Sequence, residues 1–330
     1  MIRPRNEHTI AAPCEVRGRG YWGGREVHVS FSPAPPGSGI RFVRSDLPGR
    51  PGCDVSAAAV IPGSLRTGLC QGAASFAMIE HVMAALYGLQ VDNCVVEVDG
   101  EELPGLDGSS GPFVDALRSV GMVLQGAARQ RLIIDRTIRV EENGGFIEAS
   151  PAPDGHPVFE YHLDYGDASP IKRQCYRGAL SPHTFAREIA PARTFVTAEQ
   201  VVALRAQGVG GHVTHRDLLV FDRDGLVGNE LRFLNECARH KTLDLIGDLA
   251  VTGFDLIGHF ESHRGGHRLN GLMASRLMEL AGCGSKKTSI GLGRYGGIPG
   301  DDDSNDRGSG ETELAVAKVP WGHVACSING

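Results

Sequence analysis

The chain has 330 residues, enough for two domains of ordinary size, and its 41% hydrophobic and 22% charged residues are typical of a soluble globular protein. A formal charge of -6 without a long basic run argues against nucleic-acid binding. No window approaches 18 unbroken apolar residues, which argues against a membrane span, and the eight cysteines, none in a Cys-x-x-Cys pair, indicate reduced thiols in the cytoplasm.

The first part of the chain, residues 1–126, is predicted to form strands followed by helices. Ser75 is expected to cap a helix that carries Glu80 and His81. Small polar residues follow this part and place the domain boundary near 126. The other predicted elements are extended segments within 8–50, a strand at 93–99, a long turn at 101–112 and a helix at 113–120.

The second part, residues 127–282, repeats the order of strands before helices. We therefore predict an α+β fold of two duplicated sandwich domains, with helices layered on mixed sheets. Residues 283–330 contain an acidic run and are expected to form a largely disordered tail. The predicted strands lie at 131–135, 138–141, 146–149 and 158–165, and the predicted helices at 198–207, 235–249 and 270–281.

The segment at 235–249 combines charged and apolar residues at helical spacing. Its polar residues recur every four positions along one face: Glu236, His240, Asp244 and Asp248. One turn apart, His240 and Asp244 can bind one metal ion together, as two histidines do in His-x-x-x-His. Cys237 is a further candidate ligand. The alternative is a solvated charged face, since this spacing also arises by chance.

An internal repeat changes this balance. Residues 80–88 resemble residues 239–247, with histidine aligned to histidine and a glycine seven residues later in both. A repeat about 160 residues apart indicates two related domains and not a solenoid. If the two domains face each other, His81 joins His240 and Asp244. Two imidazoles and a carboxylate are the usual ligands of a catalytic zinc ion, although His81 alone is also compatible with a core histidine.

Five separated motifs make the chain similar to the zinc-dependent UDP-3-O-acyl-N-acetylglucosamine deacetylases, the LpxC family of lipid A synthesis. The resemblance covers about residues 8–282, and its motifs lie at 79–86, 106–113, 192–195, 239–248 and 266–267. It implies two α/β sandwich domains with the active site between them. It also implies a cytoplasmic hydrolase of a Gram-negative bacterium, acting on a UDP-linked acylated amino sugar in lipopolysaccharide synthesis.

The resemblance further implies a role for each polar residue of the motifs. Glu80 would take a proton from water as general base. His267 would face the oxyanion and protonate the leaving amine, Asp248 would orient His267, and Thr194 would donate a hydrogen bond to the oxyanion. The cofactor would be Zn2+, with Fe2+ as the other candidate, and its ligands would be His81, His240 and Asp244.

Substrate contacts are also implied by the resemblance. Lys241 and Arg264 would meet the nucleotide diphosphate, and Tyr165 would stack on uracil. The alternatives are plain surface charges for the two cations and a core position for Tyr165. Phe195 would precede a passage for the acyl chain, formed by the apolar residues at 196–213, where each methylene removed from water contributes about 0.8 kcal/mol.

One loop departs from the family pattern. Trp22 stands in the glycine-rich loop at 18–24, where relatives have a histidine near the mouth of the acyl passage. The acyl-chain length therefore does not follow from the sequence. We expect a monomer whose contact with a membrane surface is at most transient.

Two other functions are compatible with part of the pattern. Two histidines and a carboxylate also form the metal site of non-haem Fe(II) oxygenases. Those enzymes normally start from His-x-Asp on a β-barrel, whereas here His-x-x-x-Asp lies on a helix. A regulatory protein that keeps its metal without turnover is the second alternative, but it would not need Glu80, His267 and Asp248.

Overall fold

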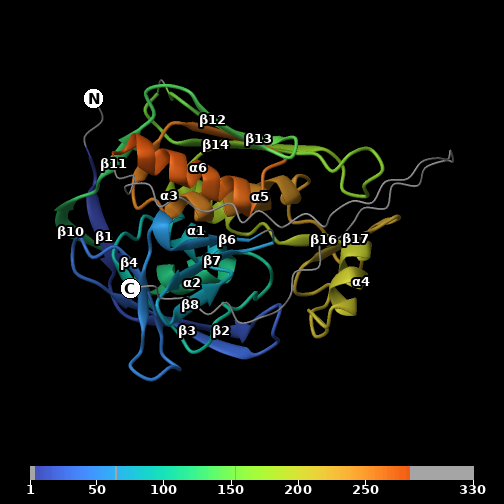
Figure 1. Cartoon of the computed structure of the whole chain (residues 1–330), viewed down its shortest axis with the longest axis horizontal. Coiled ribbons are helices and arrows are strands. Elements are labelled where there is room, and N and C mark those ends of the chain that lie inside the picture. The colour runs from blue at the N-terminus through green and yellow to red at the C-terminus, as the bar shows by residue number, and fades with distance from the viewer. Residues whose placement is uncertain (1–3, 64, 153, 283–330) are drawn as a thin grey trace, which may run out of the picture.

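The structure is a computed structural model that describes residues 4–63, 65–152 and 154–282. The predicted tail at 283–330 lies outside the described residues. In Figure 1 strands form the upper and lower layers of the molecule, and the main helices lie between them. Among the helices of the described residues, none has both the length and the apolar character that a bilayer crossing requires.

A five-stranded mixed sheet forms the outer layer of the first half. Its strands alternate in burial: along β3, Val27, Val29 and Phe31 are buried, whereas the residues between them are more exposed. This period of two directs one apolar face towards the helices. The strand order is β2 (Cys14–Arg19), β3 (Glu26–Pro33), β9 (Cys94–Val98), β4 (Ile40–Arg44) and β5 (Gly52–Asp54).

The second half contains a five-stranded sheet of the same design. Across both sheets the successive pairings are antiparallel, antiparallel, parallel and antiparallel. This identity of topology confirms the predicted α+β duplication. The strand order is β12 (Ile138–Glu142), β13 (Gly145–Ser150), β20 (His259–His263), β14 (Val158–Leu163) and β15 (Gln174–Ala179).

Each half contributes two main helices at equivalent points of its topology. The first half supplies α1 (Glu80–Gly88) before its central strand and α2 (Gly111–Val120) after it. The second half supplies α5 (Glu236–Ala250) and α6 (His267–Leu280) in the same way. The last helix begins three residues earlier than the predicted start at 270, directly after the extended residue Gly266.

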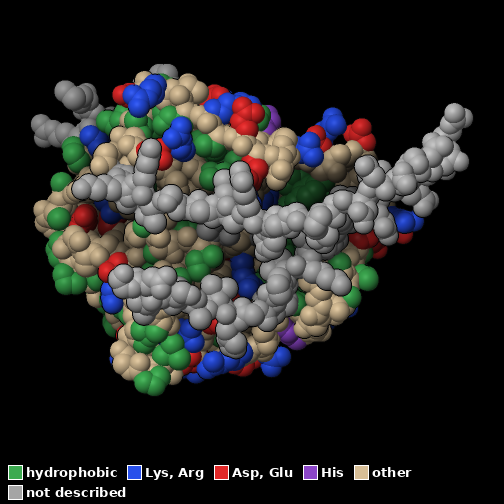
Figure 2. Space-filling view, viewed as in Figure 1, with side chains coloured by type: hydrophobic (Ala, Val, Ile, Leu, Met, Phe, Trp, Pro, Cys, Tyr) green, Lys and Arg blue, Asp and Glu red, His purple; other side chains and the backbone are tan. Residues whose placement is uncertain are grey.

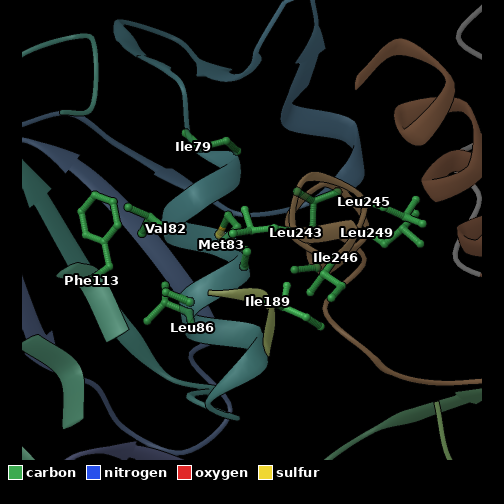
Figure 3. Close-up of a cluster of buried hydrophobic side chains, with 14 of the residues drawn as sticks. Ile79, Val82, Met83, Leu86, Phe113, Ile189, Leu243, Leu245, Ile246 and Leu249 are labelled. Atoms are coloured by element: carbon green, nitrogen blue, oxygen red, sulfur yellow. The ribbon is translucent and has the colours of Figure 1, made fainter. Parts of the chain in front are cut away.

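The two halves meet where α1 packs against α5 (Figure 3). Met83, Leu243 and Ile246 are almost completely buried in this contact. Burial of one such side chain contributes about 1.5–3 kcal/mol. A glycine permits the close approach, because a Cβ atom built on Gly247 would lie 2.1 Å from the carbonyl oxygen of Glu80.

Shorter elements connect these layers. β1 (Asn6–Ile10) pairs with β10 (Met122–Ala128), and β11 (Arg131–Ile133) pairs with β19 (Asp255–Ile257). A small sheet consists of β6 (Val60–Pro62), β7 (Thr67–Gln71) and β8 (Ala74–Ala77). Single helical turns lie at Ala57–Ala59, Pro182–Thr184 (α3) and Phe185–Ile189.

The predicted capping role of Ser75 is wrong. Ser75 lies in β8, and its hydroxyl donates to the Glu101 carboxylate. The helix begins at Glu80 after Met78, whose φ of 62° turns the chain sharply, and Ile79 provides no side-chain cap. A turn made by backbone conformation replaces the expected polar cap.

A separate small unit projects from the second half at the right of Figure 1. It consists of β16 (Phe195–Thr197), α4 (Ala198–Ala206), β17 (Leu219–Asp222) and β18 (Gly225–Leu226). The helix agrees with the prediction at 198–207. Thr197 and Gln200 form a reciprocal capping box at its start, which explains why the helix begins there.

The proposed domain boundary near residue 126 falls within β10. Because β10 pairs with β1, the strand itself lies with the first half. The second half then begins with β11, whose partner β19 also belongs to that half. We keep a division of the chain into two domains near this strand as a proposal.

Candidate metal and catalytic centre

Three side chains from the two facing helices converge on one buried point. His81 lies in the first turn of α1, and His240 and Asp244 lie on successive turns of α5. The Oδ1 atom of Asp244 is 3.7 Å from Nε2 of His81 and 3.5 Å from Nε2 of His240. The two imidazole rings meet edge to face at 5.2 Å between centroids. The structure thus brings together the three predicted metal ligands, which are all buried.

Neighbouring groups orient His240 within this cluster. Its Nδ1 atom is 3.1 Å from the carbonyl oxygen of Ala192, which can only accept, so the ring proton lies on Nδ1 and the lone pair of Nε2 faces Asp244. The Thr194 hydroxyl lies 3.1 Å from the same Nε2 and donates to the carbonyl oxygen of Gly108. Thr194 therefore lies at the edge of the cluster.

The cluster fits a divalent cation. Nδ1 of His81 and Oδ1 of Asp244 are buried and have no hydrogen-bond partner among the described residues. Buried polar atoms rarely lack a partner, and a cation would satisfy the carboxylate oxygen. The spacings of 3.5 and 3.7 Å are close to the roughly 3.4 Å expected between two ligand atoms of a tetrahedral zinc ion.

The protonation states also fit metal binding. Burial, reinforced by the neighbouring His240 ring, lowers the pKa of His81 to about 3, and burial also lowers the pKa of His240. Burial opposes ionisation of Asp244, but the Lys241 ammonium and His240 outweigh it and hold the pKa of that carboxyl well below its usual range. Two neutral imidazoles and one carboxylate therefore face each other near neutral pH.

Glu80 lies beside the cluster with its carboxylate held by the backbone. The N–H of Thr67 donates to Oε2 of Glu80 at 3.0 Å. The other oxygen, Oε1, lies 4.0 Å from Nε2 of His267. Burial raises the pKa of the Glu80 carboxyl to about 7, although His267 opposes the shift. A carboxyl with such a pKa can accept and release a proton near neutral pH.

His267, at the start of α6, is held by a hydrogen-bonded carboxylate. Its Nδ1–H donates to Oδ2 of Asp248 at 2.8 Å. Asn270 donates to the same Oδ2 at 2.7 Å, and the Thr67 hydroxyl donates to Oδ1 at 2.6 Å. Burial would lower the pKa of His267, but Asp248 and Glu80 outweigh it and raise the pKa to about 9. The free Nε2 of His267 faces the metal cluster, 3.9 Å from Asp244.

Two contributors to this centre were missed in the sequence. Asn270 lies one turn after His267 on α6, so its position was accessible once the start of that helix was known. Thr67, at the start of β7, links Glu80, Asp248 and His267, and only the folded chain brings it there. No local pattern around Thr67 indicates this role.

Glu236 does not face the centre with the other polar residues of α5. It forms a fully buried ion pair with Arg193, at 2.8 Å between Oε1 and the guanidinium. Cys237, the further candidate ligand, is buried but lies outside the group of potential ligands. The four polar residues of α5 therefore have three different roles. Glu236 forms a structural ion pair, His240 and Asp244 belong to the metal cluster, and Asp248 holds His267.

Three of the four predicted substrate contacts lie around the same centre. The Lys241 ammonium is 2.7 Å from Oδ2 of Asp244, an i,i+3 contact on α5. The ring of Phe195 meets His240 edge to face at 6.1 Å and Tyr165 at 6.0 Å between centroids. Tyr165 is half exposed and so is not a core residue.

Arg264 lies apart from these residues, in a surface hollow of about 420 Å³ that Asp164 and Arg173 also line. Its φ of 55° gives it a strained left-handed backbone conformation. The hollow is also lined by His162 and His263, side chains of β14 and β20. Arg264 therefore lies directly after β20 beside these residues, three positions before His267 in the chain.

The glycine-rich loop contacts the projecting unit of the second half. The Tyr21 hydroxyl donates to the carbonyl oxygen of Asp217, and Nε2 of His212 lies 2.8 Å from the carbonyl oxygen of Gly20. The backbone N–H of Trp22 donates to Glu102, and the guanidinium of Arg66 lies 4.6 Å above the Trp22 ring. The loop that departs from the family pattern thus lies beside the predicted acyl passage.

Comparisons with known proteins identify the family of the chain. The sequence model described as "LpxC: UDP-3-O-acyl N-acetylglycosamine deacetylase" matches residues 7–279. A UDP-3-O-acyl-N-acetylglucosamine deacetylase of Anaeromyxobacter sp. is 36% identical over 84% of this chain and 90% of its own length. Proteins of the same name from Trichormus variabilis and Brucella ovis are 38% and 37% identical over 83% and 82% of this chain, and 99% and 95% of their own lengths. The chain therefore belongs to the LpxC family of UDP-3-O-acyl N-acetylglycosamine deacetylases.

Proposed function

We propose that the protein hydrolyses the N-acetyl group of UDP-3-O-acyl-N-acetylglucosamine in lipid A biosynthesis, with Zn2+ as its cofactor. One observation carries the proposal: three potential ligands, a carboxyl with a pKa near 7 and a histidine with a pKa near 9 share one buried centre. Both halves of the chain contribute to this centre, and its residues lie within the range 7–279 that the family model matches. A merely structural metal would not require the two proton-transfer groups beside it.

His81, His240 and Asp244 would hold the cation. Bound there, it would supply positive charge that acidifies water and polarises the acetyl carbonyl. Zn2+ suits two imidazoles and a carboxylate, and Fe2+ accepts the same set. An oxygenase is disfavoured because the ligands lie on two packed helices and not on a β-barrel.

Glu80 and His267 divide the proton transfers between them. Glu80, ionised above its pKa, takes a proton from the attacking water as the new C–O bond forms to the acetyl carbon. His267, protonated below its pKa, donates its Nε2 proton to the amine as the C–N bond breaks. The products are acetate and a free amino sugar. Asp248 fixes the ring of His267 through Nδ1 and favours its charged form.

The developing oxyanion is stabilised by donors at the edge of the cluster. The charged His267 ring faces the centre, and we assign a second donor to the Thr194 hydroxyl. In the structure this hydroxyl donates to Gly108, so it would turn towards the substrate when the substrate binds. Donors of this type contribute most when the charge develops in a buried site.

The substrate's nucleotide would bind on the side of Tyr165, Phe195 and Arg264. We assign the diphosphate to Lys241 and Arg264 and the uracil ring to Tyr165, which is half exposed beside Phe195. Lys241 keeps a positive charge in this buried position, because Asp244 raises its pKa in spite of burial. The Lys241 ammonium would then contact both Asp244 and the phosphates of the substrate.

The acyl chain would follow the projecting unit that begins at Phe195. None of the residues of α4 is fully buried, and Val202 is 69% exposed, so apolar surface is available there. Val209, in the segment between α4 and β17, is buried. We propose that Trp22 and its loop limit the chain length at this end. We further propose a cytoplasmic monomer, and the free cysteines of the described residues support a reducing compartment.

The test is a deacetylation assay on purified protein with UDP-3-O-acyl-N-acetylglucosamine of several acyl lengths. We expect acetate release with at least one length, loss of activity on chelation and recovery with Zn2+. Metal analysis after aerobic purification separates Zn2+ from Fe2+. Turnover by the metal-free protein would overturn the mechanism, and no turnover at any length by the metal-loaded protein would overturn the substrate assignment.

A further inference from the structure

A second group of potential metal ligands lies on the opposite face of the second sheet. Along β14 and β20 the side chains alternate between the two faces. Tyr161, Leu163, Phe260 and Ser262 are buried towards the helices. The residues between them point outwards, and Cys175 of β15 joins them as the cross-strand partner of His162. The potential metal ligands on this outer face are His162, His259, His263, Glu160, Glu261 and Cys175.

The strand register brings these side chains together. In the parallel pair of β14 and β20, Glu160 lies opposite Glu261 and His162 opposite His263. The two carboxylates therefore lie between imidazoles. Nε2 of His263 is 2.6 Å from Glu261, and Nε2 of His162 is 2.7 Å from Glu160 and 3.7 Å from Glu261. His259 approaches Glu160 from the other side, at 3.0 Å.

We propose that this outer face binds a second divalent transition-metal ion, through His162, His263 and Glu261, with Glu160 as an adjoining ligand. The first three residues have ligand atoms within 4.8 Å of one another, and so do overlapping groups that include Glu160. Each imidazole directs Nε2 at a carboxylate, so a cation that replaces the shared ring proton meets nitrogen and oxygen together. Imidazole with carboxylate, and a thiol nearby, favours Zn2+, Ni2+ or Cu2+ over Mg2+ or Ca2+.

The distances between these side chains are compatible with replacement of the shared ring protons by a metal ion. Tetrahedral zinc ligands lie roughly 3.4 Å apart, so each distance from Nε2 to Glu261 must change by less than about 1 Å. The rings of His162 and His263 are within 13° of parallel, so they must also rotate for both Nε2 lone pairs to face one ion. The rings of His162 and His263 stack at 4.1 Å, a distance at which two imidazolium charges repel each other. One divalent ion neutralises the two carboxylates without placing charge on either ring. Arg177, 3.2 Å from Glu160, and Arg264, in the hollow that His162 and His263 also line, are competing cations on this face.

The position of the proposed site separates it from the catalytic centre. Figure 1 places β12, β13 and β14 on the outer side of α5 and α6, so the sheet lies between the two sites. Figure 2 shows acidic, basic and histidine side chains near one another along the same edge of the molecule. The proposal uses none of the residues assigned to deacetylation as ligands, although Arg264 lines the same hollow as His162 and His263.

The experiment counts zinc ions per chain. Full-length protein is dialysed to equilibrium against buffered Zn2+ at low micromolar free concentration, and bound zinc is measured by metal analysis. We expect two equivalents for the unchanged protein and one for His162→Gln/His263→Gln, with affinity at this face reduced at least about 100-fold because two ligands are lost. His240→Ala is expected to keep the outer ion while it loses the catalytic one.

A matched surface pair provides the control. His28 is 34% exposed, as His162 is, and its Nε2 lies 2.7 Å from Glu15, but no further ligand of the described residues joins this pair. His28→Gln should keep two equivalents. Equal zinc counts for the unchanged protein and the double variant would overturn the proposal. If the double variant lost both ions through misfolding, Glu261→Gln would decide by the same comparison, since it removes the charge and keeps the shape.

Discussion

Nδ1 of His267 lies 2.8 Å from the Asp248 carboxylate, and this contact is the main reason why the imidazole stays charged in a buried site. The Glu80 carboxyl lies 4.0 Å from the same ring, and burial raises its pKa, which favours its neutral form. The two groups are thus held with the acid charged and the base close to its pKa at neutral pH.

The pH profile of deacetylation should be bell-shaped. Glu80 must be ionised to take a proton, so activity should fall as the pH drops below about 7. His267 must be protonated to donate one, so activity should fall as the pH rises above about 9. Asp248→Asn removes the charge that raises the pKa of His267 and should move the alkaline limb down by about 1–2 units. An alkaline limb unchanged in this variant would contradict the assignment of His267 as the acid.

Substitution of Glu80 should separate catalysis from metal binding. Glu80→Gln keeps the size of the side chain but removes the base, and we expect kcat to fall by about 10²- to 10⁴-fold. Metal content should not change, because Glu80 is not among the three ligands. Activity assays and metal analysis on the same preparation check this. Loss of zinc from the variant would show that Glu80 is a ligand and not the base.

Removal of a metal ligand, unlike substitution of Glu80, should reduce the metal content as well as the activity. His240→Ala or Asp244→Ala leaves two of three ligands, and we expect loss of bound metal together with activity. Cys237→Ser is the matched control, since Cys237 lies on the same helix, is equally buried and does not belong to the cluster. A variant of His240 that kept stoichiometric zinc in the catalytic centre would refute the proposed ligand set.

The contact between α1 and α5 should be sensitive to a single methyl group. Gly247→Ala places a Cβ atom against the backbone of Glu80 and should destabilise the fold by about 1–3 kcal/mol. It should also weaken metal binding, because the displaced turn carries His81. Chemical denaturation and zinc titration measure the two effects. Gly126→Ala, with no atom within 4 Å of the new Cβ, is expected to do neither.

The metal ligands could be predicted because their signal is local. His240 and Asp244 are one helical turn apart, and the aligned histidine and glycine of the first half indicated that His81 would face them. The topology of the two sheets then confirmed the duplication on which this inference depended. A short-range pattern and an internal repeat were sufficient here.

Contacts that depend on tertiary structure could not be predicted in this way. Thr67 reaches Asp248 across 181 positions of the chain, and no periodicity connects them. Ser75 had the chemistry of a helix cap, but pairing of β8 fixed it in a strand. The outward histidines of β14 and β20 alternate visibly in the sequence, yet only the parallel register shows that they meet.

The duplication has a consequence for what each half can supply. Matching positions on facing helices of two identical chains would carry the same side chains. In this single polypeptide the matching positions differ: Asp244 and Lys241 stand where the first half has Ala85 and Val82. Two halves of the same topology therefore build an asymmetric centre, to which they contribute unequal numbers of ligands and different proton-transfer groups.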